Sequence, residues 1–264
     1  MTSDTSNLLD GLATEGIPNQ IVSLATIIQQ GKLMRKLLVK EGRVLAAAGS
    51  LEVELERVAL DMVEKTIESG GDTALLSLDR GEAAKLTITI EVIRPKAGLV
   101  VFGAGHVGHA LAVLGALTGY EVTLVDDREA FVSRGRVPDQ RIRLIAASFE
   151  SAASVGISSN SAVVIVTRGH QHDEICLREV ITSPARYIGM IGSKRRVIGV
   201  FQRLRNSGVD PALLERVHAP IGLDIGARSP QEIAVAILAE IIQTFNSHLI
   251  KSWGKPEPKT NRKD

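Results

Sequence analysis

The chain has 264 residues, enough for one large or two modest domains. Apolar residues make up 44% and charged residues 23%, as in ordinary soluble globular proteins. A formal net charge of +1 provides no strong field toward nucleic acid or an anionic membrane. Aromatic residues are only 3%, which leaves few platforms for stacking bases. We therefore expect neither a nucleic-acid nor a membrane partner.

Cysteine use and the chain start bear on the cellular compartment. Cys176 is the only cysteine, so neither an intramolecular disulfide nor a cysteine zinc cluster can form. The run MTSDTSNLLDG lacks the basic segment and apolar core of a signal peptide. The longest apolar stretch, 233–242, contains Glu240 and is too short to cross a bilayer. The expected compartment is the cytoplasm.

The first 94 residues predict a small α+β domain. Residues 1–16 are polar and aperiodic, which favours a flexible arm, and the domain is expected over 17–94. A β-branched strand is expected over 21–28, and a hairpin over 36–49 turning at Glu41 and Gly42. Helical spacing of apolar residues over 51–63 predicts an amphipathic helix that ends at Gly70. The alternating run 86–93 predicts a half-buried strand, and Pro95 breaks the pattern.

The pattern changes over 97–247, where apolar strands alternate with helices. Strands are expected within 98–103, 121–126, 141–148, 162–169 and 185–193. Unbroken apolar runs suit strands that are buried on both faces of a parallel sheet. The predicted fold class is therefore α/β, a Rossmann-like doubly wound parallel sheet preceded by the small α+β domain. The charged, proline-bearing tail 248–264 favours disorder.

A glycine-rich loop follows the first of these strands. Gly103, Gly105 and Gly108 fit G-x-G-x-x-G: one glycine for the turn, one for approach to a pyrophosphate, one for helix packing. The following helix offers free N–H groups to an anion. Asp126 ends the next strand, where an acid would bind a ribose hydroxyl. The alternative is a vacant or repurposed loop. His106 either faces a ligand or caps the helix.

A second loop follows the strand 162–166. Thr167 and Arg168 lie at its carboxyl end, where open α/β sheets place ligands. His170, His172 and Asp173 have side chains that suit several metals, but alternate residues at a helix start point apart. We expect a cleft role without metal. The alternative is a polar loop in which Asp173 complements the helix dipole.

Two further segments carry candidate contacts. Gly192 and Ser193 precede a helix with Ser193 as its N-cap, and Lys194, Arg195 and Arg196 fill its first turn. Cations there oppose the helix dipole, which a bound phosphate would reverse; a solvated basic face is the alternative. Asp224 is a candidate polar contact. Ser229 and Glu232 form a predicted capping box, and Cys176 is expected to be buried; these three residues are interpreted as structural.

Together these segments resemble the XdhC/CoxI family. The runs LVVFGAGHVG, VTLVDDR, VTRGHQHDEICLR, YIGMIGSKRR and PIGLDIGARSPQEIAVAILAEI occur in the family's order over about residues 85–245. The resemblance implies an accessory factor that binds molybdenum cofactor, as molybdopterin or its cytosine dinucleotide. It further implies a role in sulfuration, with a cysteine desulfurase as a candidate partner, and delivery to a molybdenum hydroxylase apoenzyme. It implies a homodimer, and family members usually lack catalysis of their own.

One position departs from the family pattern. Ser50 stands where the family usually carries a cysteine before a helix, which weakens direct ligation of molybdenum. We interpret Ser50 as the N-cap of that helix. Two alternative functions stay open: an NAD(P)-dependent oxidoreductase, with His106, His170 or Asp173 as catalytic candidates, and a nucleotide-sensing binding protein.

Overall fold

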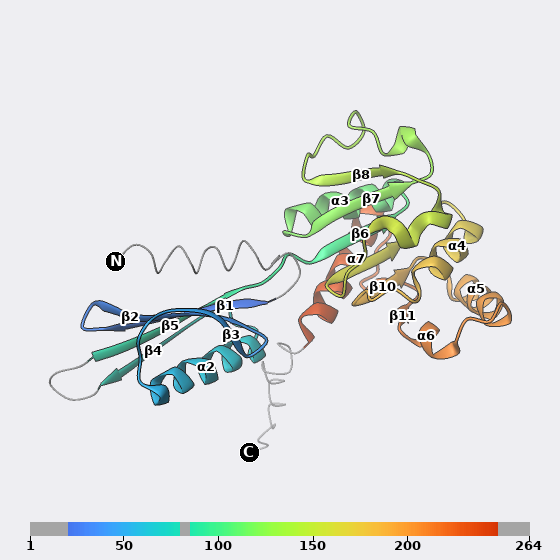
Figure 1. The fold of residues 1–264 in the computed structure, drawn as a ribbon. Helices are drawn as coiled ribbons and strands as arrows, with labels where there is room; N and C mark the ends of the chain where they lie inside the picture. The colour runs from blue at the N-terminus through green and yellow to red at the C-terminus, as the bar shows by residue number, and fades with distance from the viewer. Residues whose placement is uncertain (1–20, 80–84, 248–264) are drawn as a thin grey trace, which may run out of the picture. The chain divides into compact units, whose positions relative to one another are not determined.

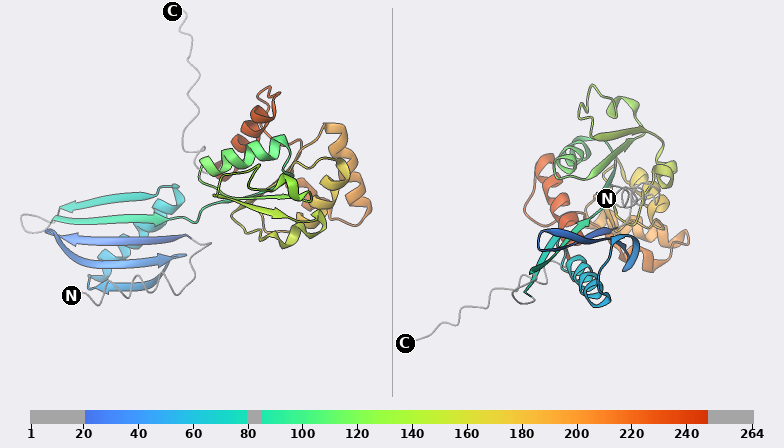
Figure 2. Two further views of the ribbon diagram at one scale, coloured as in Figure 1. Left: turned by 90° about the horizontal axis from the view of Figure 1, so that it is seen from above. Right: turned by 60° about the vertical axis from the view of Figure 1, so that its left-hand side comes forward.

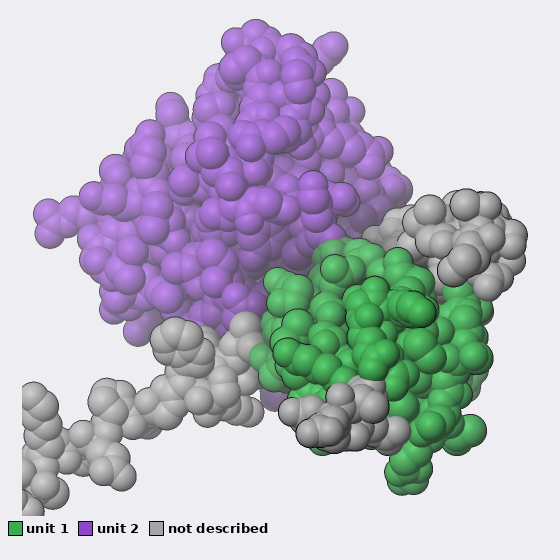
Figure 3. Space-filling view, turned by 90° about the vertical axis from the view of Figure 1, so that its left-hand side faces the viewer, with its two compact units in different colours: residues 1–95, 248–264 green, residues 96–247 purple. Residues whose placement is uncertain are grey.

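The computed structural model describes residues 21–79 and 85–247. The expected arm 1–16 and tail 248–264 lie outside the described residues. The chain divides into two compact units, residues 1–95 with 248–264 and residues 96–247 (Figure 3). No helix in the part of the chain that the structure describes is long and apolar enough to span a membrane.

The first unit is a five-stranded antiparallel sheet with one helix on one face (Figure 1). Its strands are β1 (Val22–Gln29), β2 (Lys32–Lys40), β3 (Arg43–Gly49), β4 (Thr73–Asp79) and β5 (Lys85–Ile93), and its helix is α2 (Val53–Glu68). The strand order is β3-β2-β1-β5-β4. The expected hairpin forms with positive φ at Glu41 and Gly42, as a two-residue turn requires. Ile88 and Ile90 point inward from β5 and pack against Ala59 and Val63 of α2.

Two features of this unit differ from the prediction. Strand β4 was not predicted, because Leu75 is 69% exposed and breaks the simple alternation of apolar and polar residues. The N-cap of α2 is Glu52, not Ser50, and no side chain caps the helix there. Ser50 instead directly follows β3, where its N–H donates to the carbonyl of Met34 in β2.

The second unit is a six-stranded parallel sheet with helices on both faces (Figure 2). Its strands are β6 (Gly98–Phe102), β7 (Glu121–Asp126), β8 (Ile142–Ala146), β9 (Ser161–Ile165), β10 (Tyr187–Met190) and β11 (Val217–His218). Its helices are α3 (His106–Leu117), α4 (His170–Val180), α5 (Lys194–Asn206), α6 (Pro211–Glu215) and α7 (Pro230–Phe245), with short 3-10 helices η2 (Glu129–Phe131) and η3 (Phe149–Val155). The order β11-β10-β9-β6-β7-β8 is that of a dinucleotide-binding Rossmann sheet. The predicted fold class is confirmed.

Two separate cores flank this sheet. Helices α3 and α7 pack on one face through Leu111 and Ile237, and α4, α5 and η3 pack on the other through Leu177 and Val200. All five residues of β9 are buried, as expected for a strand covered on both faces. Helix α7 begins with the predicted capping box. The two-residue strand β11 was not predicted, because two residues carry no periodicity.

Candidate functional site

The candidate site lies at the carboxyl ends of β6 and β9. These strands are neighbours in the sheet, although β7 and β8 come between them in the sequence. The strand order therefore reverses between β6 and β9, and open α/β sheets bind ligands in the crevice at such a point. The glycine loop follows β6 and the Thr167–Asp173 segment follows β9, so the fold brings the two predicted loops together.

The three loop glycines meet different surroundings. Gly103 has φ 108°, and a Cβ there would overlap the carbonyl oxygen of Val166 at the end of β9. A Cβ at Gly108 would overlap the carbonyl oxygen of Gly103. Gly105 is different, since a Cβ there has no described atom within 4 Å. The first and third glycines are thus needed by the fold, whereas Gly105 faces open space.

The amino end of α3 is open to an anion. Gly105 is its N-cap and supplies no side chain to hold the first N–H groups, which have no partner within the helix itself. His106 is exposed in this first turn. Its predicted role as a helix cap is wrong, since Gly105 is the N-cap and no side chain caps α3, and its role in facing a ligand stays a prediction. The free N–H groups and the helix dipole favour an anionic ligand at Gly105.

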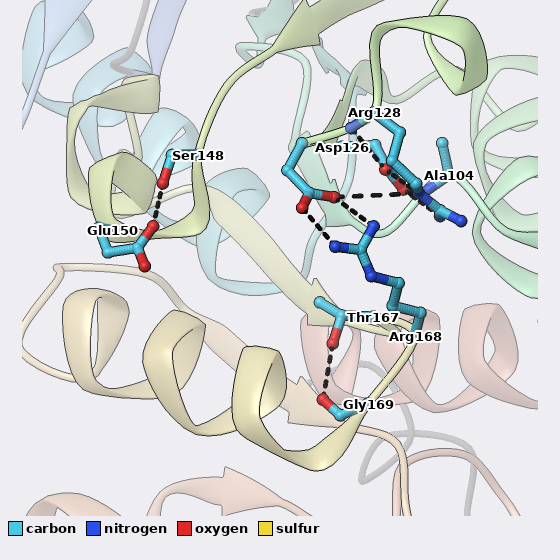
Figure 4. Close-up of polar contacts among 9 residues, drawn as sticks. Ala104, Asp126, Arg128, Ser148, Glu150, Thr167, Arg168 and Gly169 are labelled. Carbon is cyan, nitrogen blue, oxygen red and sulfur yellow. Dashed lines mark hydrogen bonds and ion pairs between the residues drawn. The ribbon is translucent and has the colours of Figure 1, made fainter.

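Asp126 is buried and fully engaged by its neighbours (Figure 4). Its Oδ1 accepts hydrogen bonds from the N–H and Nε of Arg128, at 3.0 and 2.7 Å. Its Oδ2 accepts from the N–H of Ala104 at 2.7 Å and from Nη2 of Arg128 at 2.9 Å. Burial acts to raise the pKa of Asp126, but the Arg128 guanidinium and the two backbone N–H groups outweigh it and the pKa is lowered. A carboxylate has about four acceptor sites, so this one is saturated.

The neighbouring acid, Asp127, pairs with Arg168. Nη1 and Nη2 of Arg168 donate to Oδ1 and Oδ2 of Asp127 at 2.9 and 2.7 Å. Asp127 follows β7 and Arg168 follows β9, and these two strands flank β6. The bidentate pair therefore connects the loops on either side of the glycine loop. Arg168 was a predicted site residue, whereas Asp127 was not.

Asp173 is a buried carboxyl at the start of α4. Its Oδ1 accepts a hydrogen bond from the hydroxyl of Thr167 at 2.5 Å. The same hydroxyl lies 3.2 Å from the carbonyl oxygen of Gly169 (Figure 4). Its Oδ2 is buried with no hydrogen-bond partner among the described residues. Burial raises the pKa of Asp173, against the effects of the Thr167 hydrogen bond and of the Arg196 charge.

His172 does not join Asp173 around a metal in the described structure. The ring of His172 packs edge-on against Phe149, with 5.4 Å between the ring centroids. Within residues 21–79 and 85–247, no group of three or more His, Cys, Asp or Glu side chains is arranged to hold a metal ion. The side chain of His170 lies outside the described set.

The basic turn begins α5. The hydroxyl of Ser193 accepts from the N–H of Arg196 at 3.3 Å, so the predicted N-cap is present. Lys194 and Arg195 are exposed, and the first turn contains no acidic residue. No ion pair in the described part of the chain involves either of them. The preceding Gly192 has φ 157°, which leads the chain from β10 into the helix.

Comparison with known protein families identifies the second unit. Residues 99–241 match the family described as the XdhC Rossmann domain, which is more than half of the chain. The chain belongs to the XdhC family. The predicted resemblance is confirmed, and the glycine loop, the Asp126–Arg128 cluster and the basic turn all lie within the XdhC domain.

Several curated proteins are similar to this chain over more than half of its length. YqeB of Escherichia coli (strain K12) is 35% identical over 64% of this chain and 31% of its own length. A protein of Bacillus subtilis (strain 168), named as a probable subunit of xanthine dehydrogenase, is 34% identical over 59% of this chain and 45% of its own. The molybdenum cofactor insertion chaperone PaoD of E. coli is 24% identical over 56% and 40%. The chain thus spans less than half the length of these curated relatives.

A solved structure supports the fold beyond the XdhC domain. A crystal structure described as a xanthine dehydrogenase from Bacillus halodurans matches 98% of this chain and 68% of its own chain. The TM-score is 0.64 at 22% identity, so the likeness concerns the fold. The match includes the antiparallel unit that precedes the XdhC domain.

The remaining candidates lie apart from these contacts or are structural. Asp224 is exposed, with no hydrogen bond in the described part of the chain. Cys176 is fully buried, and burial raises the pKa of its thiol. Sequence reasoning missed the roles of Asp127 and Arg128, although the run VDDR at the end of β7 contained the signal. Charged residues directly after a parallel strand lie at the edge where ligands bind.

Proposed function

We propose that this chain is an accessory factor that binds molybdenum cofactor and assists its insertion into a molybdenum hydroxylase apoenzyme. One observation carries the proposal: an XdhC domain places a glycine loop and an uncapped helix start at the point where its strand order reverses. Two relatives of the chain are named as a probable subunit of xanthine dehydrogenase and as a molybdenum cofactor insertion chaperone.

The residues at the crevice fit the phosphate end of such a cofactor. Gly105 leaves room for a phosphate, and the N–H groups that begin α3 can donate to it. When bound, the cofactor would supply a pterin phosphate or dinucleotide that carries the molybdenum centre of the client enzyme. We infer that Gly103, Gly105, His106 and Gly108 form this phosphate site, with Thr167 and Arg168 beside it. Gly192, Ser193, Lys194, Arg195 and Asp224 complete the proposed set.

This chain offers no accessible cysteine thiolate that could bind the molybdenum of the cofactor. Cys176 is the only cysteine, and its side chain points from α4 into the core, where it is fully buried. Ser50 takes the place where the family usually carries a cysteine. We therefore propose that the chain holds the cofactor by its anionic end and leaves the molybdenum free for transfer to the client.

Further details belong to the same proposal. A factor of this kind would work in the cytoplasm, as a homodimer, and would protect the cofactor during sulfuration by a cysteine desulfurase. A second candidate, an NAD(P)-dependent oxidoreductase, is favoured by the strand order. The saturation of Asp126 counts against it, since that is the acid that would bind a ribose.

Identification of the bound small molecule tests the proposal. The full chain is purified from a molybdate-replete host, and its low-molecular-weight extract is analysed by mass spectrometry. We expect a pterin phosphate or pterin dinucleotide in the wild type, and much less in Gly105→Val. Gly135→Val is the control, because a Cβ at Gly135 also meets no described atom within 4 Å and Gly135 lies outside the site. Recovery of a nicotinamide dinucleotide, or of no pterin from any preparation, would contradict the proposal.

A further inference from the structure

We propose that Arg168 binds a second anionic group of the ligand, and that Asp127 is the internal counter-ion which occupies Arg168 until that group arrives. The inference rests on the proposed function in one respect, that the glycine loop holds a first phosphate. The inference predicts that the ligand carries two adjacent anionic groups, as in a pyrophosphate. A ligand with one phosphate and a ribose diol at these positions would not match it.

The topology places the ion pair over the glycine loop. In the sheet order β9-β6-β7, the residues that pair lie beyond the ends of the two outer strands. Neighbouring strands are about 5 Å apart, so the ends of β9 and β7 are separated by roughly 10 Å. Arg168 reaches across this gap to Asp127, and β6, which lies between these two strands, ends at Phe102 directly before Gly103. A ligand at the glycine loop would therefore lie beside this pair.

The Arg168 guanidinium can donate hydrogen bonds to a phosphate. A guanidinium carries five N–H donors, and the bond to Asp127 uses two of them. The Arg168 side chain is 41% exposed, and solvent-exposed ion pairs contribute little to stability. Phosphate oxygens offer the same bidentate geometry as a carboxylate. Exchange of Asp127 for a phosphate therefore replaces one bidentate bond by another at small cost to the fold.

The β7 side of the crevice is unsuited to a ribose diol. All four acceptor sites of Asp126 are filled, and binding a hydroxyl would break a bond to Arg128 or Ala104. The Arg128 guanidinium also lies over the ring of Phe131, 3.6 Å from its centroid, and Arg136 lies over the same ring at 4.1 Å. Positive charge and a saturated acid favour an anion over a sugar here.

The simpler alternative is that Asp127 affects the ligand only as a nearby negative charge. The alternatives differ in what the loss of Asp127 does. If Asp127 competes with the ligand for Arg168, then Asp127→Asn increases affinity, and it does so only while Arg168 is present. If Asp127 acts only as a nearby negative charge, the same substitution increases affinity whether or not Arg168 is present.

A double-mutant cycle on the full chain separates these cases. Calorimetry measures binding of inorganic pyrophosphate and of inorganic phosphate to the wild type, Asp127→Asn, Arg168→Gln and the double variant. We expect Arg168→Gln to weaken pyrophosphate binding roughly tenfold, as the loss of a charge-assisted hydrogen bond implies, and to affect phosphate less. Asp127→Asn should strengthen pyrophosphate binding several-fold, and should change it less than twofold when Arg168 is already glutamine. Arg168→Lys keeps the positive charge but loses the bidentate donor geometry of the guanidinium, so its affinity for pyrophosphate should lie between those of the wild type and Arg168→Gln.

The controls distinguish this inference from the proposed function. Asp139→Asn and Arg141→Gln disrupt a comparable bidentate pair elsewhere in the unit, and both should leave the affinity unchanged. Equal effects of Asp127→Asn with and without Arg168, or an unchanged affinity in Arg168→Gln, would overturn the inference. So would failure of the wild type to bind pyrophosphate. If Gly105→Val abolishes pyrophosphate binding while Arg168→Gln does not, the phosphate site at the glycine loop is retained and only the proposed role of Arg168 is refuted. Unchanged binding in Gly105→Val would instead remove the phosphate site itself.

Discussion

Replacement of Asp126 by asparagine tests whether this buried acid holds the glycine loop. An amide keeps one acceptor oxygen but directs its NH₂ group at donors of Ala104 or Arg128, so about two of the four hydrogen bonds are lost. Hydrogen bonds to charged groups contribute about 1.5–3 kcal/mol each. Arg128 is about a third exposed, and solvent compensates part of that loss. We expect Asp126→Asn to lower the free energy of unfolding by about 2–4 kcal/mol, which for a domain of this size lowers Tm by roughly 5–15 °C.

The assay is urea unfolding followed by far-UV circular dichroism, and the chain supplies a matched control. Asp139 and Arg141 repeat the same Asp-x-Arg contact, including the bond from the backbone N–H of Arg141, and Arg141 lowers the pKa of Asp139 to about 2. No described N–H from a separate loop, like that of Ala104, donates to Asp139. Because the Asp139 side chain is 22% exposed and its carboxylate bonds only to Arg141 among the described residues, we expect only a small change in midpoint for Asp139→Asn. Equal midpoints for the two variants would refute the structural role of Asp126.

The pH dependence of the same variant gives an independent test. The pKa of Asp126 is lowered in the folded state, so its stabilisation is present above the unfolded value and is lost as the pH falls through the folded one. Unfolded aspartate titrates near about 3.9. The difference between the wild type and Asp126→Asn should be constant between pH 5 and 8, about one unit or more above that value, and should narrow below about pH 4. A difference that widens in acid would contradict the assignment.

Four other outcomes are expected. Gly105→Val should weaken pyrophosphate binding without lowering Tm, and Gly135→Val should change neither; a Gly105→Val variant that binds normally removes this glycine from the site. The double variant Lys194→Gln, Arg195→Gln should melt at the same or a slightly higher temperature while ligand or client binding falls and loses salt dependence; normal binding with a lower Tm would make the turn structural. Burial raises the pKa of Asp173, so the wild type loses stability as the pH rises from about 4 through the folded value. Asp173→Asn should lack that loss, and parallel stability curves would refute it. Light scattering at micromolar concentration should give the mass of a homodimer, and a monomer would count against that proposal.

Local patterns predicted those parts of the fold that local physics determines. The hairpin at Glu41 and Gly42, the glycine loop after β6, and the capping box of α7 each depend on residues close in sequence. Strand β4 was missed because Leu75 points outward, and β11 because it has only two residues. The Ser50 cap was wrong because the chain turns at Gly49 and the helix begins later, after Glu52.

The site was predicted only as separate pieces. The sequence marks Gly105, Asp126 and Arg168 as residues of interest, but not which of them meet. The carboxylate oxygens of Asp126 accept hydrogen bonds from Arg128 and Ala104. This pairing depends on how side chains pack around the loop. That Arg168 reaches Asp127 depends on β9 lying beside β6, which is a property of the strand order. Pairings between distant segments need the tertiary structure.

The position of β6 has a consequence for how the chain folds. Gly103 packs against the backbone of Val166 and Thr167, and Phe102 lies beside Ile165 of β9, far along the chain. Such non-local pairing forms late, because the entropy of closing the long intervening segment must be overcome first. A nascent chain or fragment that ends before β9 contains the whole glycine motif and Asp126, yet lacks the strand that shapes the turn. Ligand binding at this loop would then report completion of the second half of the sheet, and a bound cofactor would select chains that have finished folding.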